Sequence, residues 1–504
     1  MYKKLMMSKI AVIGSGFSSM SAAAYLAKAG HDVEVFEKNS GPGGRASVLR
    51  AKGYTFDMGP SWYWMPDIIE EFFADFGKIT SDYFKLTRLD PSYRVFFPED
   101  KAIDIPANFE ELRTLFESIE KGAGSELDEF MDSAQKKYEI GIREFASLPG
   151  NSPIEYLKFD LLKNAPSMEL LSSFKKMVDR RFKDKKLRLL LYFPILFLGV
   201  PPENCPAMYS LMNYADMKLG TWYPEDGMHS LALASMKLAQ EQGVKFNFKS
   251  EVEHINTINQ HACGIQVGGN SIQFDAVLAG ADYHHVDQSL LKTPSYSSKY
   301  WDKRVMSPSS LLFFVGIDKR VEGLEHHNLF FDTDLDQHSD EIYNDPKWPS
   351  DPLFYVCCPS ITDQKTAPKG KENLFILMPL GPGLKDSEEL RTKYKNIIFK
   401  RLSQRVKQDL VSHIEFIQSY CISDFEKDYN SFKGNAYGLA NTLKQTGFLK
   451  PKIRNKVIDN LYHCGQLTTP GPGVPPALMS GKIAALELLK DFTPDNTIGH
   501  EASV

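Results

Sequence analysis

The hydrophobic pattern near the start of the chain alternates between strand and helix. Between residues 9 and 38, a β-branched run, an alanine-rich stretch and a second apolar run predict a buried strand, a helix and another strand. Gly14 and Gly16 connect the first strand to the helix, and Glu37 follows the second strand. Such glycines let the backbone approach a pyrophosphate at a helix N-terminus, and the acid accepts hydrogen bonds from a ribose. The unit predicts nucleotide binding.

Ser19 departs from this pattern, because a third glycine or alanine is expected at its position. A glycine or alanine at this position normally allows close packing of the helix on the strand. We therefore expect a slightly wider fit without loss of nucleotide binding. A purely structural β-α-β unit is the alternative, since glycine pairs often mark only a turn.

A glycine-rich stretch follows the second strand. Gly43 and Gly44 permit a sharp backbone path beside a ligand, and Arg45 supplies a planar cationic donor suited to phosphate. In the turn at 57–61, Gly59 allows the backbone to lie against a flat ring. Each turn is ordinary on its own. Their position directly after the nucleotide-binding unit predicts a second wall of the same site.

The pattern changes between residues 72 and 230. Alternating residues at 93–97 and 102–105 predict an antiparallel hairpin, and helical patterns follow at 109–121 and 125–148. The nucleotide pattern does not recur there. This stretch is predicted to be an insertion that carries substrate specificity.

After residue 230, the chain is predicted to contribute to the nucleotide domain again and then to form a second insertion. A helix at 230–242, the stretch around Val252 and the apolar strand at 276–281 belong to the return. Aromatic-rich strand patterns between residues 300 and 450 predict a second specificity block. A stiff Gly/Pro loop at 468–476 then leads into a helix.

These patterns predict a chain of three parts. The nucleotide domain comprises residues 9–75, 230–300 and 455–490. The inserted α+β substrate domain comprises residues 76–229 and 301–454. A flexible tail follows at 491–504.

One segment of the insertion is strongly basic. Residues 175–188 contain eight basic and two acidic side chains, a local charge of +6, and the apolar run 189–200 follows at once. The run is too short to span a bilayer, which takes about 20 apolar residues. A helical segment at 175–200 that docks on anionic lipid and dips into it is predicted. A buried core helix after a solvated charged face is the alternative.

Composition narrows the functional classes. A net charge of −5 argues against nucleic-acid binding, which needs a basic field. The six cysteines contain no CxxC or CxxH pair, so neither a zinc site nor a disulfide framework is expected, and scattered thiols fit a reducing cytoplasm. The first residues lead into a strand without a long apolar segment, so we expect no signal peptide or N-terminal anchor.

His326 and His327 are a possible metal or acid–base pair. Adjacent residues of a strand face opposite sides, so both are not expected to bind one ion. No metal is predicted.

Several motifs in fixed order resemble the bacterial carotenoid desaturases, FAD enzymes related to phytoene desaturase and more distantly to amine oxidases. The motifs are GxGxx(S) with its acid, GGRA, GxxFDxGPS, GxWYPxxGM, SPSSLLFFVGI with HHNLFF, and GQLTTPGPGVPPALMSGK. They extend from about Lys9 to Lys490. The resemblance implies an α/β fold with a Rossmann-type FAD-binding domain. Glu225-Asp226-Gly227 departs from it, since relatives often show paired glycines there.

The resemblance also implies which residues hold FAD. Residues 14–18 would cradle the pyrophosphate, and Glu37 would bind the adenosine ribose. Further residues are implied for the ribityl chain, the isoalloxazine ring, the adenine and the pyrimidine edge of the flavin, in the order of the chain. The full set is Gly14, Ser15, Gly16, Phe17, Ser18, Glu37, Gly44, Arg45, Gly59, Pro60, Ser61, Val252, Asp282, Gly465, Gly473, Val474 and Pro475. No side chain stands out as a catalytic base.

The branch most similar to this chain desaturates the 3,4 bond of 1-hydroxylated acyclic carotenoids, as in flavobacterial pigment pathways. Phytoene desaturase is the alternative. The resemblance implies a hydrophobic carotenoid substrate in an apolar tunnel. The scattered thiols and the basic segment at 175–200 predict a protein of the cytoplasm, associated peripherally with the inner face of the cell membrane. Since no second dinucleotide motif is present, a quinone or oxygen is expected as electron acceptor.

Two other functions share this fold. A flavin amine oxidase would oxidise a polar substrate, whereas the insertions are rich in Phe, Tyr and Met. A non-catalytic isoprenoid-binding protein would have lost its flavin contacts, whereas Glu37, Arg45 and the terminal Gly/Pro loop are intact.

Overall fold

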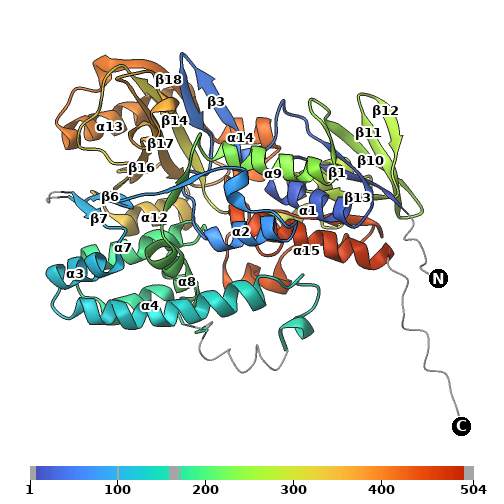
Figure 1. The fold of residues 1–504 in the computed structure, drawn as a ribbon, viewed down its shortest axis with the longest axis horizontal. Coiled ribbons are helices and arrows are strands. Elements are labelled where there is room, and N and C mark those ends of the chain that lie inside the picture. The colour runs from blue at the N-terminus through green and yellow to red at the C-terminus, as the bar shows by residue number, and fades with distance from the viewer. Residues whose placement is uncertain (1–6, 99–101, 158–167, 170–171, 493–504) are drawn as a thin grey trace, which may run out of the picture.

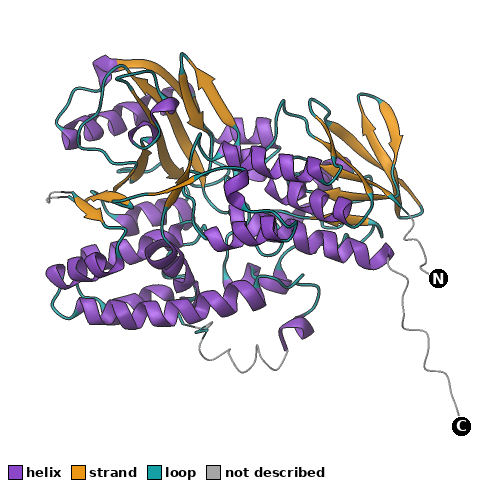
Figure 2. Cartoon of the chain, in the orientation of Figure 1, coloured by secondary structure: helices purple, strands orange, loops and turns teal. Residues whose placement is uncertain are grey.

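A computed structural model describes residues 7–98, 102–157, 168–169 and 172–492. The predicted tail lies outside the described residues from position 493 onward. The fold combines a parallel sheet near the two termini with a larger mixed sheet and a layer of helices at the opposite end (Figures 1 and 2). All six cysteines are free thiols.

A five-stranded sheet in the order β19-β13-β1-β2-β9 forms the first part. Every neighbouring pair is parallel, with Ile10 opposite Val33 on one side and Ala276 on the other. Its strands come from three separate stretches of the chain. They are β1 (Lys9–Ile13), β2 (Asp32–Phe36), β9 (Lys245–Asn247), β13 (Ala276–Ala279) and β19 (Leu461–His463).

Alternate residues of β1 enter two different cores, because successive side chains of a strand point to opposite faces. Ile10 and Val12 pack with the helices α1 (Phe17–Lys28), α9 (His229–Glu241) and α15 (Val474–Phe492). Ala11 and Ile13 pack on the opposite face, against an antiparallel sheet. The strands of that sheet are β10 (Val252–Ile258), β11 (His261–Val267) and β12 (Asn270–Gln273).

Two details of this part add to or correct the sequence predictions. Ser19 is fully buried, and a Cβ at Gly280 would lie 2.0 Å from the Ser19 hydroxyl oxygen. The missing side chain at Gly280 therefore provides the space that the serine occupies. In addition, α15 begins at Val474, within the predicted loop. Pro475 and Pro476 are tolerated there because the first turn of a helix leaves its N–H groups unbonded in any case.

The second part is built on a seven-stranded mixed sheet in the order β18-β14-β17-β16-β15-β6-β7. All neighbours are antiparallel except β15 and β6. The predicted hairpin is confirmed as β6 and β7, and the predicted aromatic strands as β14 to β17. The bounds are β6 (Tyr93–Phe96), β7 (Ile103–Ile105), β14 (Ser309–Ile317), β15 (His327–Phe330), β16 (Phe354–Cys357), β17 (Glu372–Leu380) and β18 (Ile414–Tyr420).

Helices lie on both sides of this sheet (Figure 1). A helical layer lies below it in the view, and α13 lies at its upper left. The predicted helix at 125–148 starts two residues earlier and passes into a π-helical turn at Gly141–Phe145. The helices are α3 (Phe109–Ile119), α4 (Ala123–Ile140), α6 (Phe174–Arg181), α7 (Lys185–Leu196), α8 (Leu211–Tyr214), α12 (Leu335–Tyr343), α13 (Glu388–Val406) and α14 (Ile422–Tyr429).

Shorter elements connect the two parts. They are β3 (Val48–Ala51), β4 (Tyr54–Asp57), β5 (Leu86–Arg88), β8 (Trp222–Pro224), α2 (Pro66–Ala74), α10 (Tyr283–His285) and α11 (Ser298–Asp302).

The apolar half of the predicted membrane-docking segment is buried. On α7, the side chains from Leu189 to Ile195 lie in the main core of the second part. They are therefore not available to dip into lipid, which corrects that part of the prediction. The local pattern of a core helix and of a lipid-inserting helix is the same, and tertiary packing decides between them.

The basic half of the segment is partly neutralised by acids from other elements. Lys175 pairs with Asp336 at 2.8 Å, and Arg181 pairs with Glu126 at 3.2 Å. The exposed basic residues are Lys176, Arg180, Lys183 and Lys185. Within the described residues, none of the helices is long and apolar enough to cross a bilayer.

Candidate functional site

The turn between β1 and α1 opens onto a cavity. Gly14 has a φ of +89°, and its N–H donates to the carbonyl of Phe36 at 2.8 Å, which fixes the turn against β2. A Cβ added at Gly16 would meet no atom within 4 Å. Gly16 also lines this cavity, so the space beside it is open to a ligand at the N-terminus of α1.

Ser15 and Glu37 are bonded to each other. The backbone N–H and the hydroxyl of Ser15 both donate to Glu37 Oε2, at 2.8 and 2.9 Å. The backbone N–H of Asn39 donates to Oε1 at 2.8 Å. Ser15 therefore orients Glu37 in this structure, and its contact with a pyrophosphate stays a prediction. The glutamate keeps its acceptor oxygens at the end of β2, where a ribose is expected.

Arg45 and Asp282 face the same cavity with unused polar atoms. An Arg45 Nη atom donates to the Ser431 hydroxyl at 2.7 Å, while its Nε has no partner among the described residues. Asp282 Oδ1 accepts from the N–H of His285 at 3.3 Å, and its buried Oδ2 is likewise without a partner there. Burial raises the pKa of Asp282 to about 6, against the opposing charge of Arg45. Unpaired buried polar atoms of this kind indicate a polar ligand.

The turn at 225–227 adopts left-handed backbone conformations, which glycine favours. Asp226 has a φ of +66° and Gly227 a φ of +90°, and aspartate is among the residues that tolerate this left-handed region. Asp57 accepts hydrogen bonds from the N–H groups of Met228 and His229 at 2.8 and 2.9 Å. The aspartate of the GxxFDxGPS motif thus caps the start of α9. It also fixes the turn at 225–227, which directly precedes this helix.

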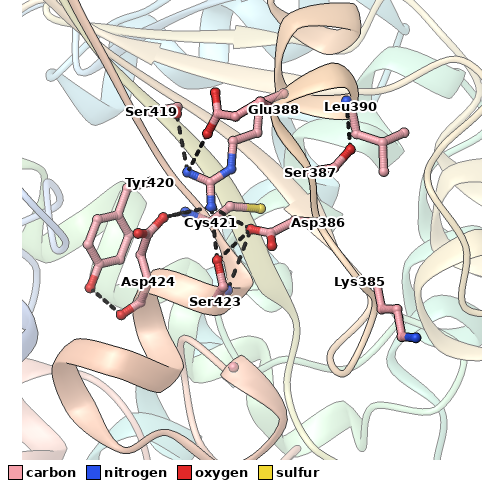
Figure 3. Close-up of polar contacts among 12 residues, drawn as sticks. Lys385, Asp386, Ser387, Glu388, Leu390, Ser419, Tyr420, Cys421, Ser423 and Asp424 are labelled. Atoms are coloured by element: carbon pink, nitrogen blue, oxygen red, sulfur yellow. Dashed lines mark hydrogen bonds and ion pairs between the residues drawn. The ribbon is translucent and has the colours of Figure 1, made fainter.

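An ion-pair cluster lies at the start of α14 (Figure 3), a helix whose later residues line the cavity. Arg391 on α13 binds Asp386 at 2.6 Å and Asp424 at 2.8 Å, and donates to the Ser419 hydroxyl at 3.3 Å. Burial raises the pKa of Asp386, but the hydrogen bond and charge of Arg391 bring it below its ordinary value. The Tyr420 hydroxyl lies within reach of both a carbonyl and a carboxylate of α14. The cluster joins α13 and β18 to α14.

We call this space the first cavity. It brings together every residue that the resemblance implied for FAD except Ser61 and Pro475. Several further lining residues were not predicted from the sequence. Lys38 and Asn39 directly follow Glu37, and their position could have indicated them. One further group comes from α14 and the loop after it, where no motif is present, and consists of Phe425, Asp428, Tyr429, Asn430, Ala436 and Tyr437.

A second cavity adjoins the first one and is apolar. It lies between the seven-stranded sheet, α7, α12 and the first turn of α15. Among the described residues that line it, none is Asp, Glu, Lys or Arg. Its apolar and aromatic wall includes Trp62, Trp64, Met65, Phe193, Leu196, Phe197, Met212, Leu329, Phe331, Leu335, Ile342, Leu353 and Leu377.

The two cavities share part of their walls. Ser61 and Pro475, the two implied residues outside the first cavity, line the second one. The shared residues are Gly59, Pro60, Ser310, Leu377, Tyr437, Pro472, Gly473 and Val474. A molecule in the second cavity therefore meets whatever occupies the first cavity at the turn formed by Gly59 and Pro60.

The histidine pair does not behave as predicted. His326 precedes the first residue of β15, so the alternation of strand side chains does not apply to it. The ring centroids of His326 and His327 are 4.5 Å apart, and ligand atoms of both and of Cys357 lie within 4.8 Å of one another. The two side chains therefore do not point apart, contrary to the prediction from strand alternation. Burial lowers the pKa of His326 to about 3, so its imidazole is neutral.

Comparison with known proteins agrees with this geometry. The family described as "Flavin containing amine oxidoreductase" matches residues 18–489. A carotenoid 3,4-desaturase of Haloarcula japonica is 39% identical over 96% of this chain and 98% of its own. A 4,4'-diapophytoene desaturase of Staphylococcus aureus is 33% identical over 96% of this chain and 99% of its own.

Solved structures show the same fold at low identity. Putrescine oxidase bound to putrescine is 15% identical with a TM-score of 0.62, over 96% of this chain and 99% of that one. An oxidoreductase of Methanosarcina mazei is 18% identical with a TM-score of 0.59, over 96% and 100%.

The residues of the first cavity fit FAD. The open space at Gly16 suits a pyrophosphate at a helix N-terminus, and Glu37 suits the adenosine ribose. The unpartnered Asp282 Oδ2 and Arg45 Nε offer further polar contacts along the cavity. The chain therefore belongs to the flavin-containing amine oxidoreductases, as an FAD-dependent oxidoreductase acting on CH–CH bonds, in the branch that contains the carotenoid desaturases.

Proposed function

We propose that this protein introduces C=C bonds into acyclic carotenoids, and that it desaturates the 3,4 bond of 1-hydroxylated carotenoids. The observation that carries the proposal is the 39% identity, over nearly the whole of both chains, to a carotenoid 3,4-desaturase. The wall of the second cavity supports it, because aromatic and aliphatic side chains suit a polyene.

The chain's own contribution is to position the substrate and to exclude water. When bound in the first cavity, FAD supplies the oxidising power, by accepting a hydrogen with its electron pair. Gly59 and Pro60 line both cavities, so they bring the bond to be oxidised to the flavin. The surrounding aromatic residues keep water away from the reacting carbons. A quinone or oxygen is the proposed electron acceptor.

Phytoene desaturation is the second candidate, favoured by the 33% identity to a 4,4'-diapophytoene desaturase. An amine oxidase reaction is disfavoured because a charged amine would enter the second cavity without a carboxylate among its described lining residues. A non-catalytic isoprenoid carrier is disfavoured by the intact wall of the first cavity.

Expression of the gene beside carotenoid precursors with and without a 1-hydroxyl group tests the proposal. Product absorption spectra should shift to longer wavelength with the hydroxylated precursor and should not change with phytoene. A shift with phytoene alone would replace the proposal by the second candidate.

We also propose that the protein docks on anionic lipid at the inner face of the cell membrane. The exposed side chains of Lys176, Arg180, Lys183 and Lys185 support this, since each basic residue near such a surface contributes about 1 kcal/mol. Docking through these charges does not require insertion of α7.

A further inference from the structure

A chain of polar groups leads out of the second cavity into the protein. Ser61 and Tyr355 both line the cavity, and the Tyr355 hydroxyl donates to the Ser61 hydroxyl oxygen at 3.0 Å. On its other side, the Tyr355 oxygen is 2.6 Å from Nδ1 of His327. Ser61 directly follows Gly59 and Pro60, which line both cavities. This chain of polar groups therefore starts where the two cavities adjoin, at the place where substrate and flavin would meet.

His327 is placed to receive a proton. It is fully buried, and its ring stacks on Trp62 with centroids 3.9 Å apart and an interplanar angle of 14°. Burial, and to a lesser extent His326, lower the pKa of His327 well below its ordinary value. The imidazole is therefore neutral at pH 7. A proton received at Nδ1 would be stabilised by the face of the Trp62 ring.

Other acid–base groups of the second cavity are not joined to a free imidazole nitrogen. Tyr343 and Tyr437 also line it, but among the described residues neither hydroxyl has a hydrogen bond to an imidazole. His338 also lines the cavity, but its Nδ1 accepts from the N–H of Leu353 at 2.9 Å and its Nε2 contacts the carbonyl of Pro379 at 3.2 Å. Both nitrogens are thus in use. Carboxylates and lysines are missing from the described lining residues. Tyr355 is connected to an imidazole whose other nitrogen has no partner among the described residues.

Desaturation creates a need for such a group, and in this respect the inference rests on the proposed function. Formation of a C=C bond removes two hydrogens from adjacent carbons. One leaves with its electron pair, and the other must leave as a proton. A cation delocalised over a polyene is a strong acid, so even a weak base suffices. The site must nevertheless give the proton a group to bind.

We propose that Tyr355 accepts the proton that the substrate loses, while its own hydroxyl proton passes to Nδ1 of His327. The substrate C–H bond breaks, and its electron pair becomes the π bond of the product. One proton binds the Tyr355 oxygen as another leaves it, so the phenol stays neutral throughout. His327 becomes the imidazolium and acts only through Tyr355. The Tyr355 hydroxyl hydrogen, which points to the Ser61 oxygen in this structure, turns toward Nδ1 for the transfer.

The first test is Tyr355→Phe, with Tyr223→Phe as a matched control. Tyr223 is also buried and its hydroxyl has no partner among the described residues, but it lines neither cavity. For the carotenoid that the wild type converts, kcat of Tyr355→Phe should fall about 100-fold, a typical contribution of acid–base catalysis. KM, FAD content and melting temperature should match those of the control.

Isotope effects separate a chemical role of Tyr355 from a structural one. Substrates deuterated at either carbon of the reacting bond should show which hydrogen limits the rate. In Tyr355→Phe, the isotope effect on kcat should rise only at the carbon that loses the proton. A distorted site would slow both transfers and leave the ratio of the two effects unchanged.

His327→Gln and the double variant test the chain as a unit. If Tyr355 and His327 act together, the double variant should be no slower than the slower single variant. His326→Gln is the control for a buried imidazole next to this chain and should keep kcat within about 3-fold of the wild type, below the effect of a lost catalytic group.

Three outcomes would overturn the inference. Tyr355→Phe could keep wild-type kcat and isotope effects. Its only defect could be a raised KM for hydroxylated carotenoids, in which case Tyr355 binds the substrate hydroxyl group. The effects of the two single variants could multiply. A wild-type protein that desaturates no carotenoid would instead refute the proposed function itself, which separates the two failures.

Discussion

Ser15 and Glu37 are joined by two hydrogen bonds to one carboxylate oxygen, at 2.8 and 2.9 Å. The pair ties the glycine turn after β1 to the end of β2. Since Glu37 is only 6% exposed, its orientation depends on these donors rather than on water.

Glu37→Ala is expected to weaken FAD binding about 10- to 100-fold, because hydrogen bonds to a charged group contribute about 1.5–3 kcal/mol and both Ser15 donors would be left unpaired. Ser15→Ala keeps the backbone bond and should weaken binding less. Quenching of flavin fluorescence measures both. Glu34→Ala, on the same strand but not lining the first cavity, should bind FAD as the wild type does.

Gly280→Ala should lower the free energy of unfolding by about 1–3 kcal/mol, as overpacked cores do. The added Cβ would lie 2.0 Å from the Ser19 hydroxyl oxygen. Ser19→Gly in the same chain should restore much of the loss. Urea unfolding of the two single variants and the double variant gives the coupling energy, and additive effects would contradict this packing relationship.

Asp282→Asn should change how the stability of the FAD-free protein depends on pH. Because the folded-state pKa of Asp282 is raised from 3.8 to about 6, the folded chain retains a proton between these pH values that the unfolded chain releases. Stability from this group is therefore lost as pH rises from about 4 to about 6, by about 3 kcal/mol. Asparagine still caps α10 but does not ionise.

Urea unfolding between pH 4 and pH 7 measures this change. The stability of Asp282→Asn relative to the wild type should rise with pH across the window. A difference that stays constant with pH would show that Asp282 titrates normally.

Arg391→Met should lower the free energy of unfolding by about 3 kcal/mol, because removal of one partner leaves buried charge uncompensated. The carboxylates affected are Asp386 and Asp424 (Figure 3). FAD affinity should fall as well, since α14 lines the first cavity. Asp386→Asn combined with Arg391→Met should be more stable than Arg391→Met alone, and the reverse order would contradict the role of the ion pair.

Replacement of the four exposed basic residues at 176, 180, 183 and 185 by Gln should weaken binding to anionic vesicles about 100- to 1000-fold, since each contributes about 1 kcal/mol. Liposome flotation at low salt measures this. A control variant loses the same charge from exposed lysines elsewhere, at Lys369, Lys393, Lys400 and Lys407. Equal binding of both variants would refute docking through this segment.

The sequence predicted the elements whose signals are local. The β-α-β unit is specified by alternation and by glycines at fixed offsets, and the hairpin of β6 and β7 by alternation alone. The residues implied for FAD lie along two adjoining cavities because the motifs that carry them contain the turns that bend there. Their contacts with FAD stay a prediction.

What the sequence did not reveal depends on contacts between distant residues. Tyr355 lies beside Ser61 only because β16 occupies the middle of a seven-stranded sheet, and nothing near residue 355 signals this. The burial of α7 depends on partners from other elements, which its own pattern cannot specify. His326 and His327 approach each other because the strand begins one residue later than the pattern predicted.

The strands of the parallel sheet are synthesised at widely separated times. β1 ends at Ile13, but β19, which pairs with β13, begins only at Leu461. At a synthesis rate of about 5–20 residues per second, roughly 20–90 s separate these strands on the ribosome. Until β19 arrives, the edge of β13 is an unpaired template for aggregation. FAD can therefore bind its complete site only near the end of synthesis, and chaperones that shield strand edges should raise the yield of flavin-loaded protein.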